Sequence, residues 1–171
     1  MIAGSVNLCQ AQNYYAILTS QQEVPVAQNN DTTTYSTGVE ATFTLSGTTL
    51  ATSGIFGNLL GEPNLATGVT IELGPAGVQG SPLFDIPVTF ETPEGGGLYF
   101  GTFSGSVTLT GPEIAELNNF GLYLNITTPT QNPLTPGGEV RGQIVPVPEP
   151  ATMTLMGVGS LAWLAIRRRK A

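Results

Sequence analysis

The sequence predicts an all-β domain in which two antiparallel sheets pack as a sandwich with Greek-key connections. Three observations support this fold class. Short segments alternate apolar and polar residues with the period of two that is typical of a strand with one buried face. Turns rich in glycine and proline separate these segments. Only one short segment between residues 12 and 145 has helical character, which argues against interleaved helices.

The first half of the predicted domain contains the clearest strands. Tyr14–Leu18 is expected to form the first strand. In residues 39–45, Val, Ala, Phe and Leu alternate with Glu and Thr, and Ser46-Gly47 then turns the chain into a strand over 48–56. These two strands and their turn predict a β-hairpin. Residues 69–73 repeat the alternation and form the next expected strand.

Glycine and proline define the middle of the domain. Gly74-Pro75-Ala76-Gly77 is a turn-forming cluster. Residues 83–90 read as a strand, and Pro87 within it places that strand at an edge or a bulge. Residues 98–109 read as a long strand, whose glycines at 101 and 105 predict bending where the two sheets meet.

The last third of the domain contains the helical segment and two further strands. Residues 111–117 begin Gly-Pro-Glu, and proline near the start with acids in the first half favours a helix of about two turns. Residues 122–126 and 140–144 alternate as strands, and the proline-rich segment 128–138 between them is expected to be a loop.

The C-terminal residues 146–171 have the three parts of a membrane-sorting segment. Val147-Pro148-Glu149-Pro150 precedes sixteen uncharged residues, 151–166, and these precede a basic stop formed by Arg167, Arg168, Arg169 and Lys170. A helix over 151–166 would be about 24 Å long against a hydrocarbon core of about 30 Å, so it spans only with snorkelling at its ends. Positive charge stays in the cytoplasm, so residues 1 to 146 are expected outside the membrane.

This segment resembles the PEP-CTERM sorting signal, in which a Pro-Glu-Pro motif, here 148–150, precedes a short span and an arginine cluster. The resemblance implies export by the general secretion machinery, anchoring in the inner membrane and processing by an exosortase near Pro-Glu-Pro. The alternative is a simple membrane-anchored domain without exosortase processing.

The N-terminal residues 1–11 are small and mostly apolar, and Cys9 and Ala11 suit the −3 and −1 positions of a signal-peptidase site. We expect them to be the remnant of a signal peptide whose basic part is encoded upstream. The alternative is a frayed or first-strand N-terminus. The expected organisation is therefore 1–11 signal remnant, 12–145 β-sandwich and 146–171 sorting segment.

Composition excludes several classes of function. Residues 1–150 hold all twelve acids and a single cation, Arg141, a net charge of −11, so the body should repel nucleic acid and anionic lipid. The sequence has no histidine, which excludes imidazole metal sites and Ser-His-Asp or Cys-His catalysis. One cysteine, Cys9, permits no intrachain disulfide. We therefore expect no enzyme, no cofactor and no metal.

Three segments in order are similar to the chordin-type CHRD domain: residues 18–25 (LTSQQEVP), 71–83 (IELGPAGVQGSPL) and 111–144, which includes GLYLNITT. The resemblance implies an immunoglobulin-like or superoxide-dismutase-like β-sandwich with a poorly defined role; in animals the domain is a module of an extracellular antagonist of growth factors. Where many members carry histidine, this chain has Thr70, Glu72 and Thr127. Any metal site built on those imidazoles is therefore absent here.

Arg141 is the one candidate site residue within the body. A guanidinium on a predicted strand needs a partner, and we expect a structural ion pair with Glu23 or Glu139 that ties the start of the domain to its last strand. The functional alternative is capture of an anionic sugar or carboxylate ligand.

The sequence as a whole predicts an exported bacterial surface or extracellular-matrix protein with a structural or adhesive role, whose partners are the exosortase, the membrane and extracellular polysaccharide. The alternative from another class is an extracellular module that binds carbohydrate or calcium. Asp31 is the calcium candidate, but no Asp-x-Asp-x-Asp spacing supports it.

Overall fold

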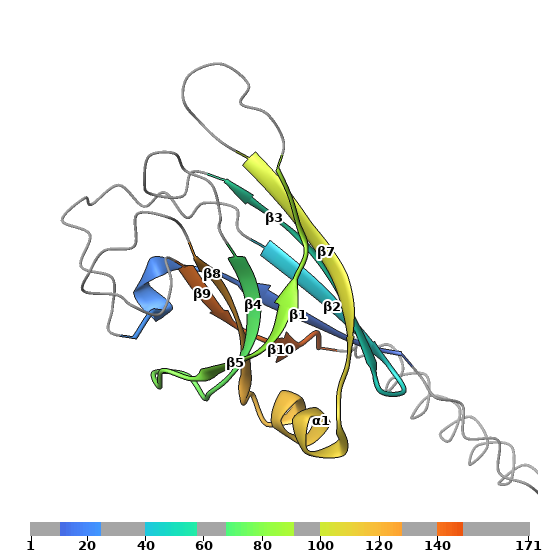
Figure 1. The fold of residues 1–171 in the computed structure, drawn as a ribbon. Helices are drawn as coiled ribbons and strands as arrows, with labels where there is room; N and C mark the ends of the chain where they lie inside the picture. The colour runs from blue at the N-terminus through green and yellow to red at the C-terminus, as the bar shows by residue number, and fades with distance from the viewer. Residues whose placement is uncertain (1–10, 25–39, 58–67, 91–99, 128–139, 149–171) are drawn as a thin grey trace, which may run out of the picture.

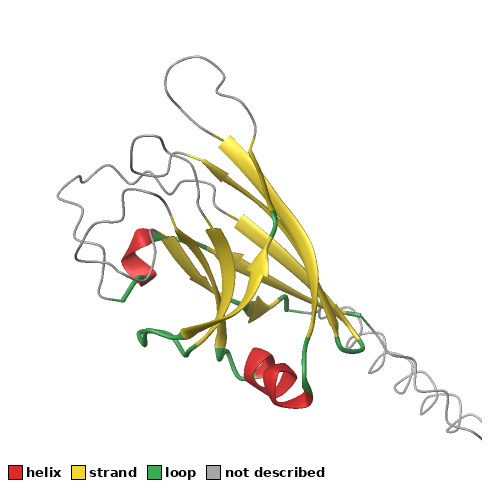
Figure 2. Cartoon of the chain, viewed as in Figure 1, coloured by secondary structure: helices red, strands yellow, loops and turns green. Residues whose placement is uncertain are grey.

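The structure is a computed structural model and describes residues 11–24, 40–57, 68–90, 100–127 and 140–148. These residues form two antiparallel sheets that pack face to face, with one α-helix at one end (Figures 1 and 2). The prediction of a mainly β, two-sheet antiparallel domain with one short helix is therefore confirmed.

The larger sheet, sheet A, has six strands in the order β10-β1-β2-β3-β7-β6. Its centre is the predicted hairpin, in which Gly47 adopts a left-handed φ of 62° at the turn. Polar and apolar residues alternate strictly along β2, so one face is buried and the other exposed. The strand bounds are β1 Gln12–Ile17, β2 Glu40–Ser46, β3 Thr49–Gly57, β6 Val88–Phe90, β7 Phe100–Thr108 and β10 Val145–Pro146.

The smaller sheet, sheet B, has four strands in the order β5-β4-β8-β9. The bounds are β4 Gly68–Leu73, β5 Ser81–Ile86, β8 Leu122–Thr127 and β9 Val140–Gln143. Unlike β2, strand β8 is buried on both faces from Leu122 to Ile126. Sheet B therefore has a covered outer side, which the alternation in its sequence does not indicate.

Two pairs of consecutive strands connect the sheets at their edges. Strand β5 ends sheet B and β6 ends sheet A, and Pro87 is the single residue between them. Strand β9 ends sheet B and β10 ends sheet A, and Ile144 separates them in the same way. The prediction that Pro87 marks an edge is thus confirmed, because proline cannot donate to either ladder.

The core lies between the sheets and is formed by aliphatic and aromatic side chains. Glycines allow the rings to lie directly over neighbouring strands: a Cβ on Gly101 would collide with the ring of Phe56, and one on Gly54 with the ring of Phe103. Gly101 therefore serves close packing within the continuous strand β7. The buried apolar residues include Tyr14, Leu18, Phe43, Leu50, Phe56, Ile71, Phe103, Leu117, Leu122, Leu124, Ile126 and Ile144.

Helix α1, Gly111–Asn118, confirms the predicted helix and is fixed at both ends. The Glu113 carboxylate accepts hydrogen bonds from the Thr110 backbone N–H at 2.6 Å and from the Thr110 hydroxyl at 2.8 Å. Asn118, in the last turn, accepts a 2.7 Å hydrogen bond from the Tyr14 hydroxyl of β1. A short 3₁₀ helix, η1 (Ser20–Gln22), was not predicted and follows β1.

Several predicted segments lie outside the described residues. They include residues 1–10, the loop 128–138 and the sorting residues from Glu149 onward, with the expected span 151–166 and the basic stop 167–170. Within the described ranges, neither helix is long and apolar enough to cross a membrane. The transmembrane helix therefore stays a prediction from the sequence.

Candidate functional site

The outer face of sheet B carries a cluster of polar side chains arranged in two rows. Strand register places Thr70, Asn125 and Arg141 side by side on β4, β8 and β9. The next row consists of Glu72, Tyr123 and Gln143 on the same three strands. Although they point away from the core, most are covered: Glu72 is 8 % exposed, and Asn125, Tyr123 and Arg141 are 2 % exposed or less. We call these six residues the polar face.

Glu72 is the acceptor at the centre of the polar face. One carboxylate oxygen accepts a 2.5 Å hydrogen bond from the Tyr123 hydroxyl. The other accepts from the Asn125 amide at 2.8 Å and from the Thr70 hydroxyl at 3.0 Å. Three donors from two strands therefore compensate the burial of this carboxylate, as a buried charge requires.

Tyr123 connects Glu72 to the rest of the polar face. Its hydroxyl donates to Glu72 and accepts a 3.0 Å hydrogen bond from the Gly80 backbone N–H. Burial, together with the hydrogen bond to Glu72, raises the pKa of the Tyr123 hydroxyl to about 12. The ring also lies under Arg141, whose guanidinium carbon is 3.4 Å from the ring centroid, a close cation–π contact.

Arg141 fastens the turn after β4 onto the polar face. Its guanidinium donates to the carbonyl oxygens of Val78 at 2.7 Å and Pro75 at 2.8 Å. Its backbone exchanges hydrogen bonds with Thr19, at 2.9 and 3.2 Å, just after β1. Arg141 therefore joins the start of the domain to the last strand of sheet B through its main chain.

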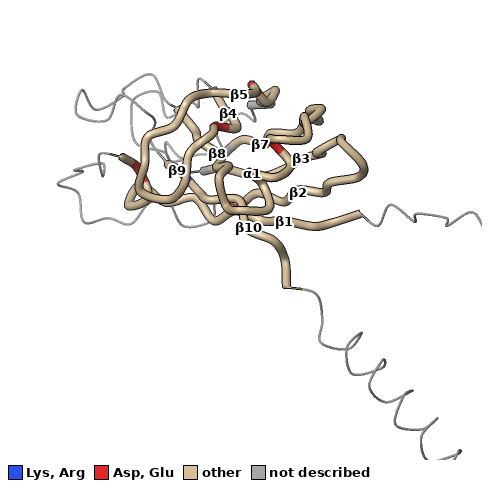
Figure 3. Tube along the Cα trace, turned by 90° about the horizontal axis from the view of Figure 1, so that it is seen from below, with Lys and Arg blue, Asp and Glu red and all other residues tan. Residues whose placement is uncertain are grey.

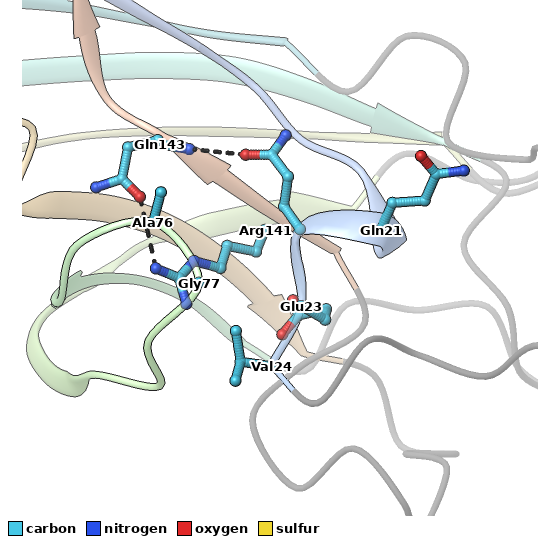
Figure 4. A pocket seen from close by; sticks show the side chains of 8 residues that line it. Gln21, Glu23, Val24, Ala76, Gly77, Arg141 and Gln143 are labelled. Atoms are coloured by element: carbon cyan, nitrogen blue, oxygen red, sulfur yellow. Dashed lines mark hydrogen bonds between the residues drawn. The ribbon is translucent and has the colours of Figure 1, made fainter.

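Of the two predicted carboxylate partners of Arg141, Glu23 lies within the described residues and Glu139 does not. Glu23 is 3 % exposed and lines the same pocket as Arg141, next to η1 (Figure 4). Glu139 lies outside the described residues. The ion pair between Arg141 and either glutamate stays a prediction. The structure adds partners that the sequence did not suggest, namely two turn carbonyls and an aromatic ring.

Gln143 is a second residue of β9 that joins several elements, and no pattern in the sequence singles it out. Its amide nitrogen donates to the carbonyl oxygens of Gly74, Phe120 and Leu122 at 3.2, 2.5 and 2.9 Å. Its backbone N–H donates to the Gln22 side chain of η1 at 3.3 Å. Gln143 thus holds together η1, the turn after β4 and the segment after α1.

A pocket of about 400 Å³ opens beside Arg141 and Gln143 (Figure 4). One wall is formed by η1 and the residues after it, and the opposite wall by the turn after β4. The lining residues are Gln21, Gln22, Glu23, Val24, Ala76, Gly77, Arg141 and Gln143. The lining combines amide and charged side chains with the apolar residues Val24 and Ala76. The amides of Gln22 and Gln143 already bond within the protein.

Charges in the described part of the chain do not form a metal site. The acidic residues are spread over several elements, with Glu113 and Glu116 together on α1 (Figure 3). Arg141 is the single cation among the described residues. No group of three or more potential metal ligands occurs within residues 11–24, 40–57, 68–90, 100–127 and 140–148. Thr70 and Glu72 hydrogen-bond to each other, and Thr127 pairs with Gly68 further along the same ladder.

The sorting motif begins where the described structure ends. Its first residue, Val147, is 44 % exposed, and its backbone N–H donates to the Asn13 carbonyl oxygen at 2.9 Å. Pro148 is exposed as well, and Glu149 and Pro150 lie beyond the described residues.

Comparison with known families gives two matches that divide the chain at residue 145. Residues 14–144 match the CHRD domain, and residues 146–170 match the PEP-CTERM protein-sorting motif. No curated protein matches the chain. The fold and these matches together define a two-sheet β domain followed by a C-terminal sorting segment. The chain belongs to the CHRD domain family and carries a PEP-CTERM sorting motif, which confirms both resemblances found in the sequence.

Proposed function

We propose that this chain is an exported bacterial protein that displays its CHRD domain on the cell surface or in the extracellular matrix, in a structural or adhesive role. The C-terminal helix over 151–166 first anchors it in the inner membrane, with the basic stop in the cytoplasm. An exosortase then processes the chain near Glu149. The observation that carries the proposal is the pair of family matches, which place a sorting motif directly after one domain.

The charge distribution supports this topology. Four of the five cations lie at 167–170, and the rest of the chain is acidic. A basic cluster holds the end of a short span in the cytoplasm, while an acidic body has no electrostatic reason to stay at an anionic membrane surface. Residues 1–11 would serve as the remnant of the export signal, 12–145 as the displayed body, and 146–171 as the sorting segment.

The proposed role of the body is non-enzymatic. The polar face contains a buried carboxylate, a tyrosine and an arginine, but their described contacts bind strands and turns to one another. Such contacts fix the structure of a domain that must survive outside the cell. We also propose that the two sheets form the Greek-key sandwich of immunoglobulin-like or superoxide-dismutase-like domains, because strands cross between the sheets at both edges.

A second candidate function is binding of extracellular carbohydrate, and the pocket beside Arg141 favours it. Gln21 is exposed at the pocket rim, so Gln21→Ala should weaken binding while leaving the stability of the domain unchanged. A glycan array probed with the purified body and with this variant separates the two candidates. Binding lost in the variant supports the carbohydrate module, and absence of binding by the wild type supports the structural role.

Sorting is tested by replacing Pro148, Glu149 and Pro150 with alanine in a chain tagged within the body. In a bacterium that encodes an exosortase, the wild type should appear as a shortened form at the surface or in the medium. The alanine variant, or the wild type without exosortase, should accumulate as a longer form in the inner membrane. If the two chains give the same long membrane form in all strains, the protein is a simple membrane-anchored domain.

A further inference from the structure

The last strand of the body and the matched sorting segment overlap at Pro146. Strand β10 consists of Val145 and Pro146, and the match to the sorting motif begins at residue 146. In the fold Pro146 pairs with Tyr14, and Val145 pairs with Tyr15 of β1. Figure 3 shows β10 beside β1, where the described chain leaves the body. No spacer therefore separates the folded domain from the motif.

The short distance between fold and motif restricts access to the motif. Glu149 follows Val147 by two residues, which span at most about 7 Å of extended chain. An enzyme that processes this segment must hold residues on both sides of the reacting bond in an extended conformation. The backbone of 145–147 would then have to bind the enzyme, but in the fold it is paired with β1.

Strand β10 is weakly held compared with the residue before it. Both residues of β10 are only half-buried, Pro146 has no N–H to donate, and Val147 is 44 % exposed. Ile144, in contrast, is fully buried and donates its backbone N–H to the Leu122 carbonyl oxygen at 3.0 Å. The chain can therefore open up to Ile144 at low cost while the core stays intact.

We propose that β10 is a detachable strand, and that its release from β1 gives the exosortase access to the backbone that leads into the sorting motif. Release frees residues 145–148 and extends the reach of the motif by about 13 Å, with Ile144 as the point where the chain stays fixed. The rate of processing then scales with the fraction of chains in which β10 is released from β1. This inference rests on the proposed function, because it concerns how the exosortase gains access to its substrate.

The test is a disulfide that locks β10 in place. Tyr15 and Val145 face each other across an antiparallel ladder, where Cα atoms lie about 4.5–5.5 Å apart, within disulfide range. Tyr15→Cys with Val145→Cys, in a chain with Cys9→Ser, should slow processing by at least about tenfold, because a disulfide favours the paired state by more than that factor. Pulse-labelled cells and immunoblotting measure the shortened form.

The matched control is a second lock within the same sheet. Thr42 and Ser53 also face each other and are exposed, so Thr42→Cys with Ser53→Cys should leave processing unchanged. In the chain locked at β10, about ten Gly and Ser residues inserted between Val147 and Pro148 should restore processing.

Processing of the locked chain at the wild-type rate would overturn the inference, as would failure of the linker to restore it. A wild type that is never shortened would instead refute the proposed sorting, so the two failures are distinguishable. Reduction of the disulfide gives the final check, because the reduced chain should be processed at the wild-type rate.

Discussion

The outer faces of the two sheets are both polar but have opposite environments. On sheet A, hydroxyl side chains such as those of Thr42, Ser53 and Ser104 are exposed to solvent. On sheet B, Glu72, Asn125 and Arg141 are at least about nine-tenths buried. The turn after β4 and η1 contribute to this cover, since both hydrogen-bond to side chains of β9.

The difference shows that the same polar pattern on a strand affects stability differently when its polar side is exposed and when it is covered. An exposed hydroxyl on sheet A is hydrogen-bonded to water in both the unfolded and the folded state, so it contributes little to stability. A carboxylate or guanidinium on sheet B has lost its water and must be matched by protein donors or acceptors. The polar face of sheet B should therefore be sensitive to single substitutions, and the outer face of sheet A should tolerate them.

Replacement of Arg141 should have the largest effect. Arg141→Met removes the guanidinium that donates to the carbonyl oxygens of Val78 and Pro75, and it removes the cation–π contact with Tyr123. The Pro75 oxygen keeps its hydrogen bond from the Val78 backbone N–H. We expect the free energy of unfolding to fall by about 2–4 kcal/mol. Urea denaturation measures it. Unchanged stability together with loss of a ligand would show that Arg141 serves binding rather than structure.

Replacement of Glu72 should have the next largest effect. Glu72→Ala leaves the Tyr123 hydroxyl, the Asn125 amide and the Thr70 hydroxyl without their shared acceptor. A loss of about 2–3 kcal/mol is expected, and Glu72→Gln, which keeps one carbonyl acceptor, should lose less. Equal stability of the alanine and glutamine variants would contradict a role for these hydrogen bonds.

Tyr123→Phe should cost about 1–2 kcal/mol, because the hydroxyl bonds both Glu72 and the Gly80 N–H. It should also change the dependence of stability on pH. The fold raises the pKa of Tyr123 from 10.0 to about 12, so its contribution is fully present below pH 10 and is lost as pH rises toward 12.

Thermal unfolding at several pH values between 9 and 12 measures this effect. The wild type should lose stability over this range more steeply than Tyr123→Phe. Tyr14, whose pKa is also raised by burial, contributes a slope that both proteins share. Parallel curves for the two proteins would contradict the assignment to Tyr123.

The smallest effects are expected on sheet A. Thr42→Val and Ser53→Ala remove a 3.3 Å contact between two exposed hydroxyls on β2 and β3. Each should change the free energy of unfolding by no more than about 0.5 kcal/mol. Urea denaturation of these two variants and of Arg141→Met under the same conditions compares their free energies of unfolding. A loss as large as that of Arg141→Met would show that the two faces do not differ as described.

The sequence predicted those parts of the fold that depend on neighbouring residues. The β2–β3 hairpin follows from alternation on either side of Ser46-Gly47, and α1 follows from Pro112 with Glu113 near its start. The sorting motif could also be predicted from the sequence, because it is a linear signal, and the family match confirms it.

The polar face could not be predicted, because its contacts join residues far apart in the chain. Glu72 and Tyr123 are 51 positions apart, and Arg141 and Val78 are 63 apart. Period-two alternation indicates which side of a strand is polar, but not whether a later turn covers that side. Arg141 stood out only because it is the one cation of the body, and Gln143 had no such signal.

The mass of the mature protein is the sharpest test of export and sorting. Intact-mass spectrometry of the protein recovered from the cell surface or medium gives a mass that can be compared with those expected for the processed and the full-length chain. We expect a body that ends near Glu149 and lacks the hydrophobic segment 151–166 and the basic stop 167–170. Recovery of a full-length chain ending at Ala171 from the cytosol would contradict export and sorting together.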